Sequence, residues 1–169
     1  TSASKVERVA VDAGAGNARL TVDSTQGALP FSQGIAYEGG SDSDELVLKG
    51  GTASSDLYWI GPNPGQGIST LVIGGVIQAV NFVNTEPVLD LVAGPLEVNA
   101  TPADNAINYT QGSVASNGRV TVDNFASIEF SNKTTLTVNG LAGSDFISLN
   151  NPSSPTGLTS ITVHGGDPT

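Results

Sequence analysis

Short runs of alternating apolar and polar residues cover most of the chain. Val, Ile and Leu fill the apolar positions, and Gly, Asn, Asp, Ser or Pro separates one run from the next. A two-residue period places one face of a run against a core, which is typical of a half-buried β-strand. No segment carries an apolar stripe at helical spacing. We therefore predict strands over Arg8–Asp12, Ala18–Val22, Ile35–Glu38, Glu45–Lys49, Asp56–Ile60, Thr70–Ile73, Ile77–Val83, Val88–Leu91, Leu96–Asn99, Ala106–Thr110, Arg119–Val122, Ala126–Phe130, Thr135–Asn139, Phe146–Leu149 and Ser160–His164.

Two dipeptides mark sharp changes of direction between predicted strands. They are Gly74-Gly75 and Asp123-Asn124. Glycine does not resist a positive φ, so Gly-Gly suits a tight turn. Each dipeptide forms either a β-hairpin or a sharp corner between stacked turns of a solenoid, and the sequence leaves both interpretations open.

The chain contains an internal repeat. Val9–Asp23 aligns without a gap with Leu136–Asn150, 127 residues later. After a gap of one residue the match continues, and Ile35–Gly40 aligns with Ile161–Gly166. The final part of the chain therefore resembles its first part.

The repeat predicts the organisation of the chain. We expect residues 1–169 to form a single β-repeat domain, one unit of ~127 residues and the start of the next, with residues 1–42 resembling 127–169. Strands with one buried face cannot cover that face alone, whereas stacked units bury it against each other. A parallel β-helix or β-solenoid of short strands with Gly, Asn and Asp turns meets this requirement. A β-sandwich is the alternative.

A second repeat lies inside the first. Leu71–Val88 resembles Arg119–Leu136 at a shift of 48 residues, with Val80–Asn84 (VNFVN) over Ile128–Asn132 (IEFSN). Similarity between units of this kind favours a stacked array over an accidental likeness among short strands.

Three turns share a pattern of glycine followed by aspartate or serine and an apolar residue. They read GGSDSDELV at Gly39–Val47, GGTASSDLY at Gly50–Tyr58 and GLAGSDFIS at Gly140–Ser148. This pattern resembles the nonapeptide GGxGxDxUx, with U apolar, of RTX-type bacterial exoproteins. In that family the glycines permit tight turns, the apolar residue fills the core and the aspartates bind calcium between adjacent turns.

The resemblance implies a calcium site with Asp42, Asp44 and Asp145 as ligands, since Ca²⁺ prefers several oxygen ligands. Calcium ligands in the family come from two successive turns. Here the copies begin at residues 39, 50 and 140, and only the first two adjoin. The alternative is that each aspartate accepts hydrogen bonds from backbone within its own turn.

Composition excludes several classes of function. Six Lys and Arg stand against sixteen Asp and Glu, a net charge of −10, which argues against nucleic-acid binding. The chain has no cysteine, so disulfides and thiolate metal sites are excluded. No apolar run is long enough for direct membrane insertion. The chain has one histidine, His164, which we expect at the surface, and it has no GxSxG motif. The sequence thus offers no convergent acid, base and nucleophile, so we expect no enzyme.

Aromatic residues and one loop supply the remaining candidate chemistry. Tyr37, Tyr58 and Trp59 are a potential sugar-binding platform, but we expect Trp59 to pack in the core or at one end of the array. The loop GPNPGQG, residues 61–67, is expected to be exposed and to carry binding specificity.

These observations predict a non-enzymatic structural or spacer module of a large extracellular repeat protein. The chain is similar to the degenerate β-repeats of giant bacterial surface proteins and adhesins, which implies a secreted or cell-surface location. The expected partners are neighbouring repeats of the parent chain and a cell-surface or carbohydrate ligand, and Ca²⁺ is the one cofactor considered. A calcium-stabilised binding module and a carbohydrate-active β-helix are the alternatives.

Overall fold

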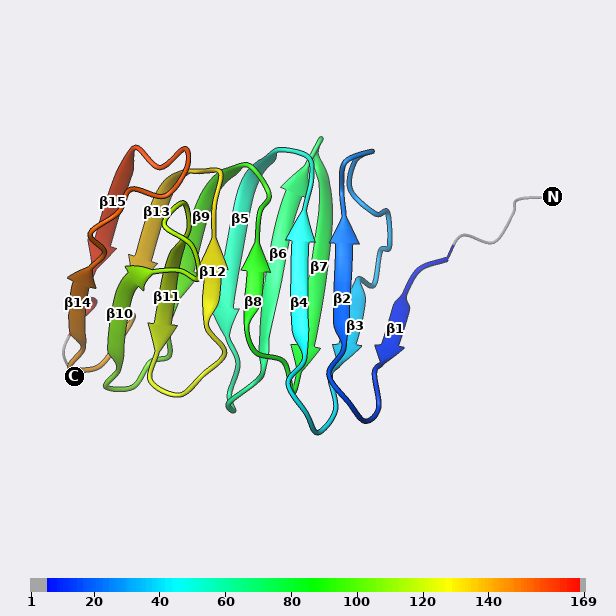
Figure 1. The fold of residues 1–169 in the computed structure, drawn as a ribbon, viewed down its shortest axis with the longest axis horizontal. Coiled ribbons are helices and arrows are strands. Elements are labelled where there is room, and N and C mark those ends of the chain that lie inside the picture. The colour runs from blue at the N-terminus through cyan, green and yellow to red at the C-terminus, as the bar shows by residue number, and fades with distance from the viewer. Residues whose placement is uncertain (1–5, 168–169) are drawn as a thin grey trace.

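The protein is built from two β-sheets stacked face to face (Figure 1). The computed structural model describes residues 6–167. Within this part of the chain there are fifteen strands and no helix. Inward side chains of both sheets form one hydrophobic core, so the expectation of an all-β protein is confirmed.

The eight-stranded sheet, called sheet A, has the order β1-β3-β7-β6-β5-β9-β13-β15. Its strands are β1 (Val9–Asp12), β3 (Ile35–Glu38), β5 (Ala53–Ile60), β6 (Gly67–Ile73), β7 (Val76–Val83), β9 (Gly94–Asn99), β13 (Lys133–Asn139) and β15 (Ser160–His164).

The seven-stranded sheet, called sheet B, has the order β14-β10-β11-β12-β8-β4-β2. Its strands are β2 (Arg19–Asp23), β4 (Glu45–Lys49), β8 (Val88–Asp90), β10 (Ala106–Gln111), β11 (Gly118–Val122), β12 (Ile128–Phe130) and β14 (Phe146–Asn150). Every strand predicted from the sequence is present, with bounds that differ by three residues or fewer.

The chain alternates between the two sheets and advances along the array. Most neighbouring strands are therefore parallel. Each sheet is interrupted once by an antiparallel meander, β5-β6-β7 in sheet A and β10-β11-β12 in sheet B. Both sheets are thus mixed, which corrects the expectation of a wholly parallel arrangement.

Parallel neighbours lie at a small set of sequence offsets. Residues of β1 and β2 lie opposite residues 26 positions later in β3 and β4. The offset is 45 between β3 and β7, 42 between β4 and β8, and 25 between β13 and β15. It is 40 in the other parallel pairs, as for Leu96 opposite Leu136 and Val88 opposite Ile128. The register brings apolar side chains into rows, such as Leu20, Leu46, Val88 and Ile128 across sheet B.

The two meanders share a packing arrangement, in which Phe82 and Phe130 are the equivalent residues that the 48-residue shift aligns. Tyr58 and Phe82 stack with ring centroids 5.9 Å apart, and Gly67 on the central strand lies directly opposite Phe82. In sheet B, Tyr109 and Phe130 stack at 6.4 Å, with a glycine, Gly118, again opposite the phenylalanine. The glycines leave room for the rings, which cover backbone that has no side chain.

The dipeptides and the long repeat can now be placed. Gly74-Gly75 closes the β6–β7 hairpin with φ of 59° and 79°. Asp123-Asn124 belongs to a longer connection between the antiparallel strands β11 and β12. The segments that align at 127 residues are β1-β2-β3 and β13-β14-β15, and each passes from sheet A to sheet B and back. Residues 1–5 and 168–169 of the expected domain lie outside the described residues.

A methyl group added at either meander glycine should destabilise the protein. A Cβ on Gly67 would lie 2.5 Å from Phe82 Cζ, and one on Gly118 would lie 2.6 Å from Phe130 Cζ. We expect Gly67→Ala and Gly118→Ala to lower the free energy of unfolding by about 1–3 kcal/mol, as overpacking does. Urea denaturation measures this loss. Gly165→Ala is the matched control, because a Cβ there meets no described atom within 4 Å, and equal effects at all three positions would contradict the interpretation.

Candidate functional site

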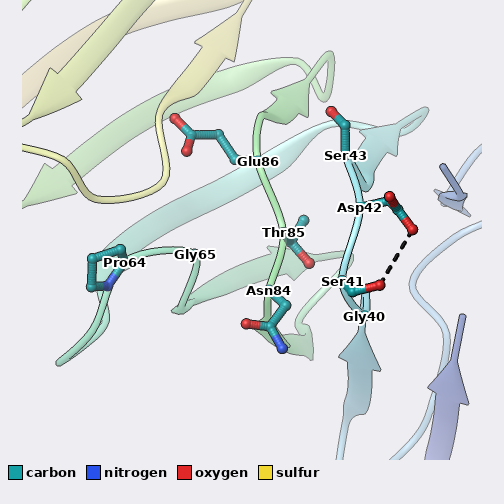
Figure 2. A pocket seen from close by; sticks show the side chains of 9 residues that line it. All are labelled: Gly40, Ser41, Asp42, Ser43, Pro64, Gly65, Asn84, Thr85 and Glu86. Carbon is teal, nitrogen blue, oxygen red and sulfur yellow. Dashed lines mark hydrogen bonds between the residues drawn. The ribbon is translucent and has the colours of Figure 1, made fainter. Parts of the chain in front are cut away.

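Three connections between strands meet around a shallow, polar pocket (Figure 2). They are residues 40–43 between β3 and β4, residues 64–65 between β5 and β6, and residues 84–86 between β7 and β8. The pocket has a volume of about 620 Å³. The acidic turn and the GPNPGQG loop, which the sequence marked separately, therefore line one pocket.

Backbone hydrogen bonds hold these connections together. The Thr85 amide donates to the Gly65 carbonyl at 3.0 Å, and the Glu86 amide donates to the Asp44 carbonyl at 2.8 Å. The Asn84 side chain donates to Glu38 at 2.6 Å. The pocket is therefore a rigid seam between neighbouring turns, lined by hydroxyls, backbone groups and two carboxylates.

The aspartates of the first acidic turn accept hydrogen bonds from the preceding turn. Asp42 Oδ2 accepts from the Gly16 amide at 2.8 Å, and Asp44 Oδ1 accepts from the Ala18 amide at 2.8 Å. Asp42 is exposed and Asp44 is buried. Both donor amides lie 26 residues earlier in the sequence. The two carboxylates therefore link one connection between strands to the connection beside it, and they do not bond only within their own connection.

The third predicted ligand, Asp145, lies in a different turn near the other end of the array, between β13 and β14. Its Oδ1 accepts a hydrogen bond from the Asn105 amide at 2.9 Å, 40 residues earlier. Asp104 makes the reciprocal bond and accepts from the Ser144 amide at 2.7 Å. The structure therefore does not bring Asp145 together with Asp42 and Asp44, although all three make the same kind of contact.

The spacing of glycine and aspartate in these turns has a steric cause. A Cβ on Gly39 would lie 3.0 Å from Asp44 Oδ2, and a Cβ on Gly140 would lie 2.1 Å from Asp145 Oδ2. The glycine at the first position of the motif thus makes room for the aspartate at the sixth. The Oδ2 atoms of Asp44 and Asp145 are buried and have no hydrogen-bond partner within residues 6–167.

The arrangement offers no ready cation cage among the described residues, where no group of three or more Asp, Glu, His or Cys side chains could hold a metal ion. Figure 2 shows the side chains of Asp42 and Glu86 pointing away from each other. Calcium binding therefore stays a prediction, and amide capping is the role that the observed contacts give these aspartates.

The aromatic residues are arranged differently from the expectation. Tyr37 and Tyr58 are buried in the core, which excludes a sugar-binding platform that includes them. Trp59, expected in the core or at an end, lies on the outer face of sheet A and is 41% exposed. Adjacent residues of a strand point to opposite faces, so with Tyr58 inside Trp59 must lie outside. His164 is exposed, as predicted.

A polar cluster on sheet B surrounds the buried carboxylate of Glu129. Arg119 lies opposite Glu129 and forms an ion pair with it at 2.7 Å. Ser113 donates through its backbone amide and its hydroxyl, and Asn117 donates through its side chain at 2.7 Å. Burial alone would raise the pKa of Glu129, but these hydrogen bonds outweigh it and lower the pKa to about 2.

A second charged cluster, not predicted from the sequence, lies inside the core. Lys133 contacts Asp56 and Asp90, and all three side chains have no exposed surface. Alternation could have revealed the aspartates, because Asp56 shares a face with Tyr58 and Asp90 shares one with Val88. Lys133 could not be found in this way, since an irregularity in β13 separates it from the alternating segment that begins at Leu136.

Comparison of the chain with family models, curated proteins and solved structures found no match. The described residues include no helix long and apolar enough to cross a membrane. The function must therefore be argued from the geometry of the protein itself.

Acid should weaken the protein through Glu129. The pKa of this side chain is depressed from 4.5 to about 2, so its contribution to stability is complete above 4.5 and is lost as the pH falls towards 2. We expect Glu129→Gln to reduce the change in unfolding free energy over this pH range, as measured by urea denaturation at several pH values. Glu86→Gln, at an exposed glutamate, is the control and should follow the wild type. Parallel curves for Glu129→Gln and the wild type would contradict this role.

Proposed function

We propose that this chain is a structural module, a segment of β-solenoid that serves as a stiff spacer in a secreted or cell-surface repeat protein of the adhesin type. The observation that carries the proposal is the path of the chain. It crosses repeatedly between two sheets and, apart from the two meanders, adds parallel strands to each sheet at offsets of 26, 45, 42, 40 and 25 residues. A chain that advances in this way lengthens along one axis as units are added.

The ends of the array support stacking against neighbouring repeats. Leu149 on β14 and Ile161 on β15 lie beside the core residues Tyr109 and Leu136, on the inward face. They are nevertheless 57% and 38% exposed, because they lie on edge strands and have a neighbour on one side only. Burying such a side chain contributes about 1.5–3 kcal/mol, which favours a further unit at this position.

The solenoid proposal predicts that the array can be lengthened in register. By the 127-residue shift, residue 136 corresponds to residue 9. A chain in which residues 9–169 follow residue 135 should unfold in one cooperative transition, with a larger dependence on urea concentration than the parent, because more surface is buried. Small-angle X-ray scattering should show a longer particle of similar cross-section.

A shift of one residue supplies the matched control. If residues 10–169 follow residue 135, the alternation in the next strand is reversed and its apolar side chains point outward. This chain should unfold in separate transitions or aggregate. Two independent transitions in the in-register chain, or equal behaviour of the two chains, would contradict the spacer proposal.

A calcium-stabilised binding module is the second candidate. It is favoured by the buried Oδ2 atoms of Asp44 and Asp145, which have no protein partner in the part of the chain that the structure describes. A carboxylate oxygen in this state costs free energy, which a bound cation would offset.

Thermal melting tests this candidate. If calcium binds there, the melting temperature should be higher in calcium than in EDTA, and Asp44→Asn should reduce the difference. Asp104→Asn is the control, since Asp104 is exposed and does not share the unpartnered Oδ2. Equal melting temperatures in calcium and EDTA would exclude the candidate.

A further inference from the structure

The core contains a lysine between two aspartates. Lys133 Nζ lies 2.5 Å from Asp56 Oδ2 and 2.9 Å from Asp90 Oδ1. Asp56 and Lys133 belong to sheet A, and Asp90 belongs to sheet B. The three side chains therefore meet between the sheets, where no water-exposed surface remains to any of them.

The neighbours of both aspartates are apolar. Asp56 lies opposite Leu71, and Asp90 lies between Leu48 and Phe130 in its row. In other strands of the two sheets, the corresponding inward positions are occupied by buried apolar residues. Charged groups placed there carry a large desolvation cost, and a well-packed apolar set would be at least as stable.

The hydrogen bonds of the cluster are incomplete. Asp56 Oδ1 and Asp90 Oδ2 are buried and find no partner among residues 6–167. Two ionised carboxylates and one ammonium would also leave an uncompensated negative charge in the core. Burial and the neighbouring Asp90 raise the pKa of Asp56 well above its ordinary value, which favours its neutral form.

The two aspartates are not equivalent. Asp90 Oδ1 also accepts a hydrogen bond from the Val92 amide at 3.0 Å. Asp56 accepts a hydrogen bond from Lys133, and its side chain is also in hydrogen-bonding contact with Asp90. Burial alone would lower the pKa of Lys133, but the two acidic side chains outweigh it and raise the pKa. The cluster thus places the Lys133 ammonium between two acids with different surroundings.

We propose that Lys133 and Asp56 join in an intramolecular amide bond, with Asp90 as the group that moves the protons. A neutral carboxylic acid is an electrophile at its carbonyl carbon, whereas a carboxylate is not. The Nζ atom lies 2.5 Å from Oδ2 of Asp56, and two reacting groups held together in this way react as if at very high concentration. The proposal does not depend on the spacer function.

The steps balance without any further reagent. Lys133 first passes one proton to Asp90, and its free amine then attacks Cγ of neutral Asp56. The new carbon–nitrogen bond forms a tetrahedral intermediate. Asp90 gives its proton to the departing hydroxyl and takes one from the nitrogen, so water leaves and Asp90 remains protonated. The products are one amide, one water molecule and a neutral Asp90.

The surroundings favour the amide over the separated groups. The reaction removes an ammonium group from the core and leaves Asp90 neutral, so the desolvation cost of both charges disappears. Exclusion of water from the core opposes hydrolysis. The bond would connect β5 to β13 across β9 and close a loop between residues 77 positions apart. Such a loop restricts the unfolded chain as a disulfide does, in a protein that has no cysteine.

Mass spectrometry of the denatured wild-type protein tests the proposal. After prolonged incubation of the folded protein, we expect the intact mass to be lower than the sequence mass by one water molecule. Tryptic digestion should fail to cut after Lys133 and should join residues 50–119 to residues 120–169. An intact mass equal to the sequence mass, with normal cleavage after Lys133, would overturn the proposal.

Further digestion identifies the acid. Residues 50–119 contain both aspartates, and chymotrypsin separates them by cutting at Tyr58, Trp59 and Phe82. The cross-linked peptide should contain Asp56. A cross-link to Asp90 would overturn the assignment of the two roles.

Variants of the three residues distinguish amide formation from a purely structural role of the cluster. Lys133→Arg and Asp56→Ala should show the full mass, and Asp90→Asn should show it because the proton carrier is lost. Asp56→Asn should still form the bond but release ammonia, a result that a merely structural ion cluster cannot give. Circular dichroism reports whether each variant folds, and the wild-type mass remains decisive if one does not.

The exposed pair Lys49 and Asp23 is the internal control. Their atoms lie 3.1 Å apart, close to the distances in the core, but both side chains are nearly half exposed. Hydrogen bonds from Thr25 and Lys49 lower the pKa of Asp23 to about 2, so this acid is a carboxylate and normal tryptic cleavage after Lys49 is expected. Cross-linking at Lys49 as well would show that proximity alone suffices and would overturn the role of burial.

Discussion

The fold depends on a core that is one side-chain layer thick. Inward residues of sheets A and B meet directly, and the register between strands arranges them in rows such as Leu20, Leu46, Val88 and Ile128. Each residue is covered by its two row neighbours and by the opposite sheet. A row without a neighbour leaves its last member exposed, as at Leu149. The need to cover inward-facing apolar side chains therefore determines how the core is packed. It also explains why such side chains are exposed on the edge strands.

This constraint explains why the strands could be predicted and their order could not. A single-layer core makes the two-residue alternation visible in each strand, and all fifteen described strands follow from it. The alternation does not say which sheet a strand enters. Gly67 and Gly118 mark the central strands of the meanders, but their role depends on Phe82 and Phe130, which belong to other strands. The antiparallel interruptions were therefore not predictable.

In the acidic turns, too, one feature could be predicted from the sequence and another could not. In two of these turns a glycine precedes an aspartate by five residues, and the structure gives a steric reason at Gly39 and Asp44. The partners of the carboxylates could not be foreseen, because the donor amides of Gly16, Ala18 and Asn105 lie one turn earlier in space and 26 or 40 residues earlier in sequence. Spacing within a motif reports local sterics, whereas contacts between turns depend on the register.

The Lys133 cluster is a place where ionisable side chains interrupt the apolar rows of the core. Rows of apolar residues would accept leucine or phenylalanine in place of Asp56 and Asp90, as their neighbours Leu71 and Phe130 show. Three ionisable side chains from β5, β8 and β13 occupy this place, and two of their oxygens lack partners in the described structure. A permanent ion cluster leaves that cost in the folded protein. An amide between Lys133 and Asp56 removes the desolvation cost of the buried charges. The ammonium and the carboxylate are needed for the reaction, and neither remains in the product.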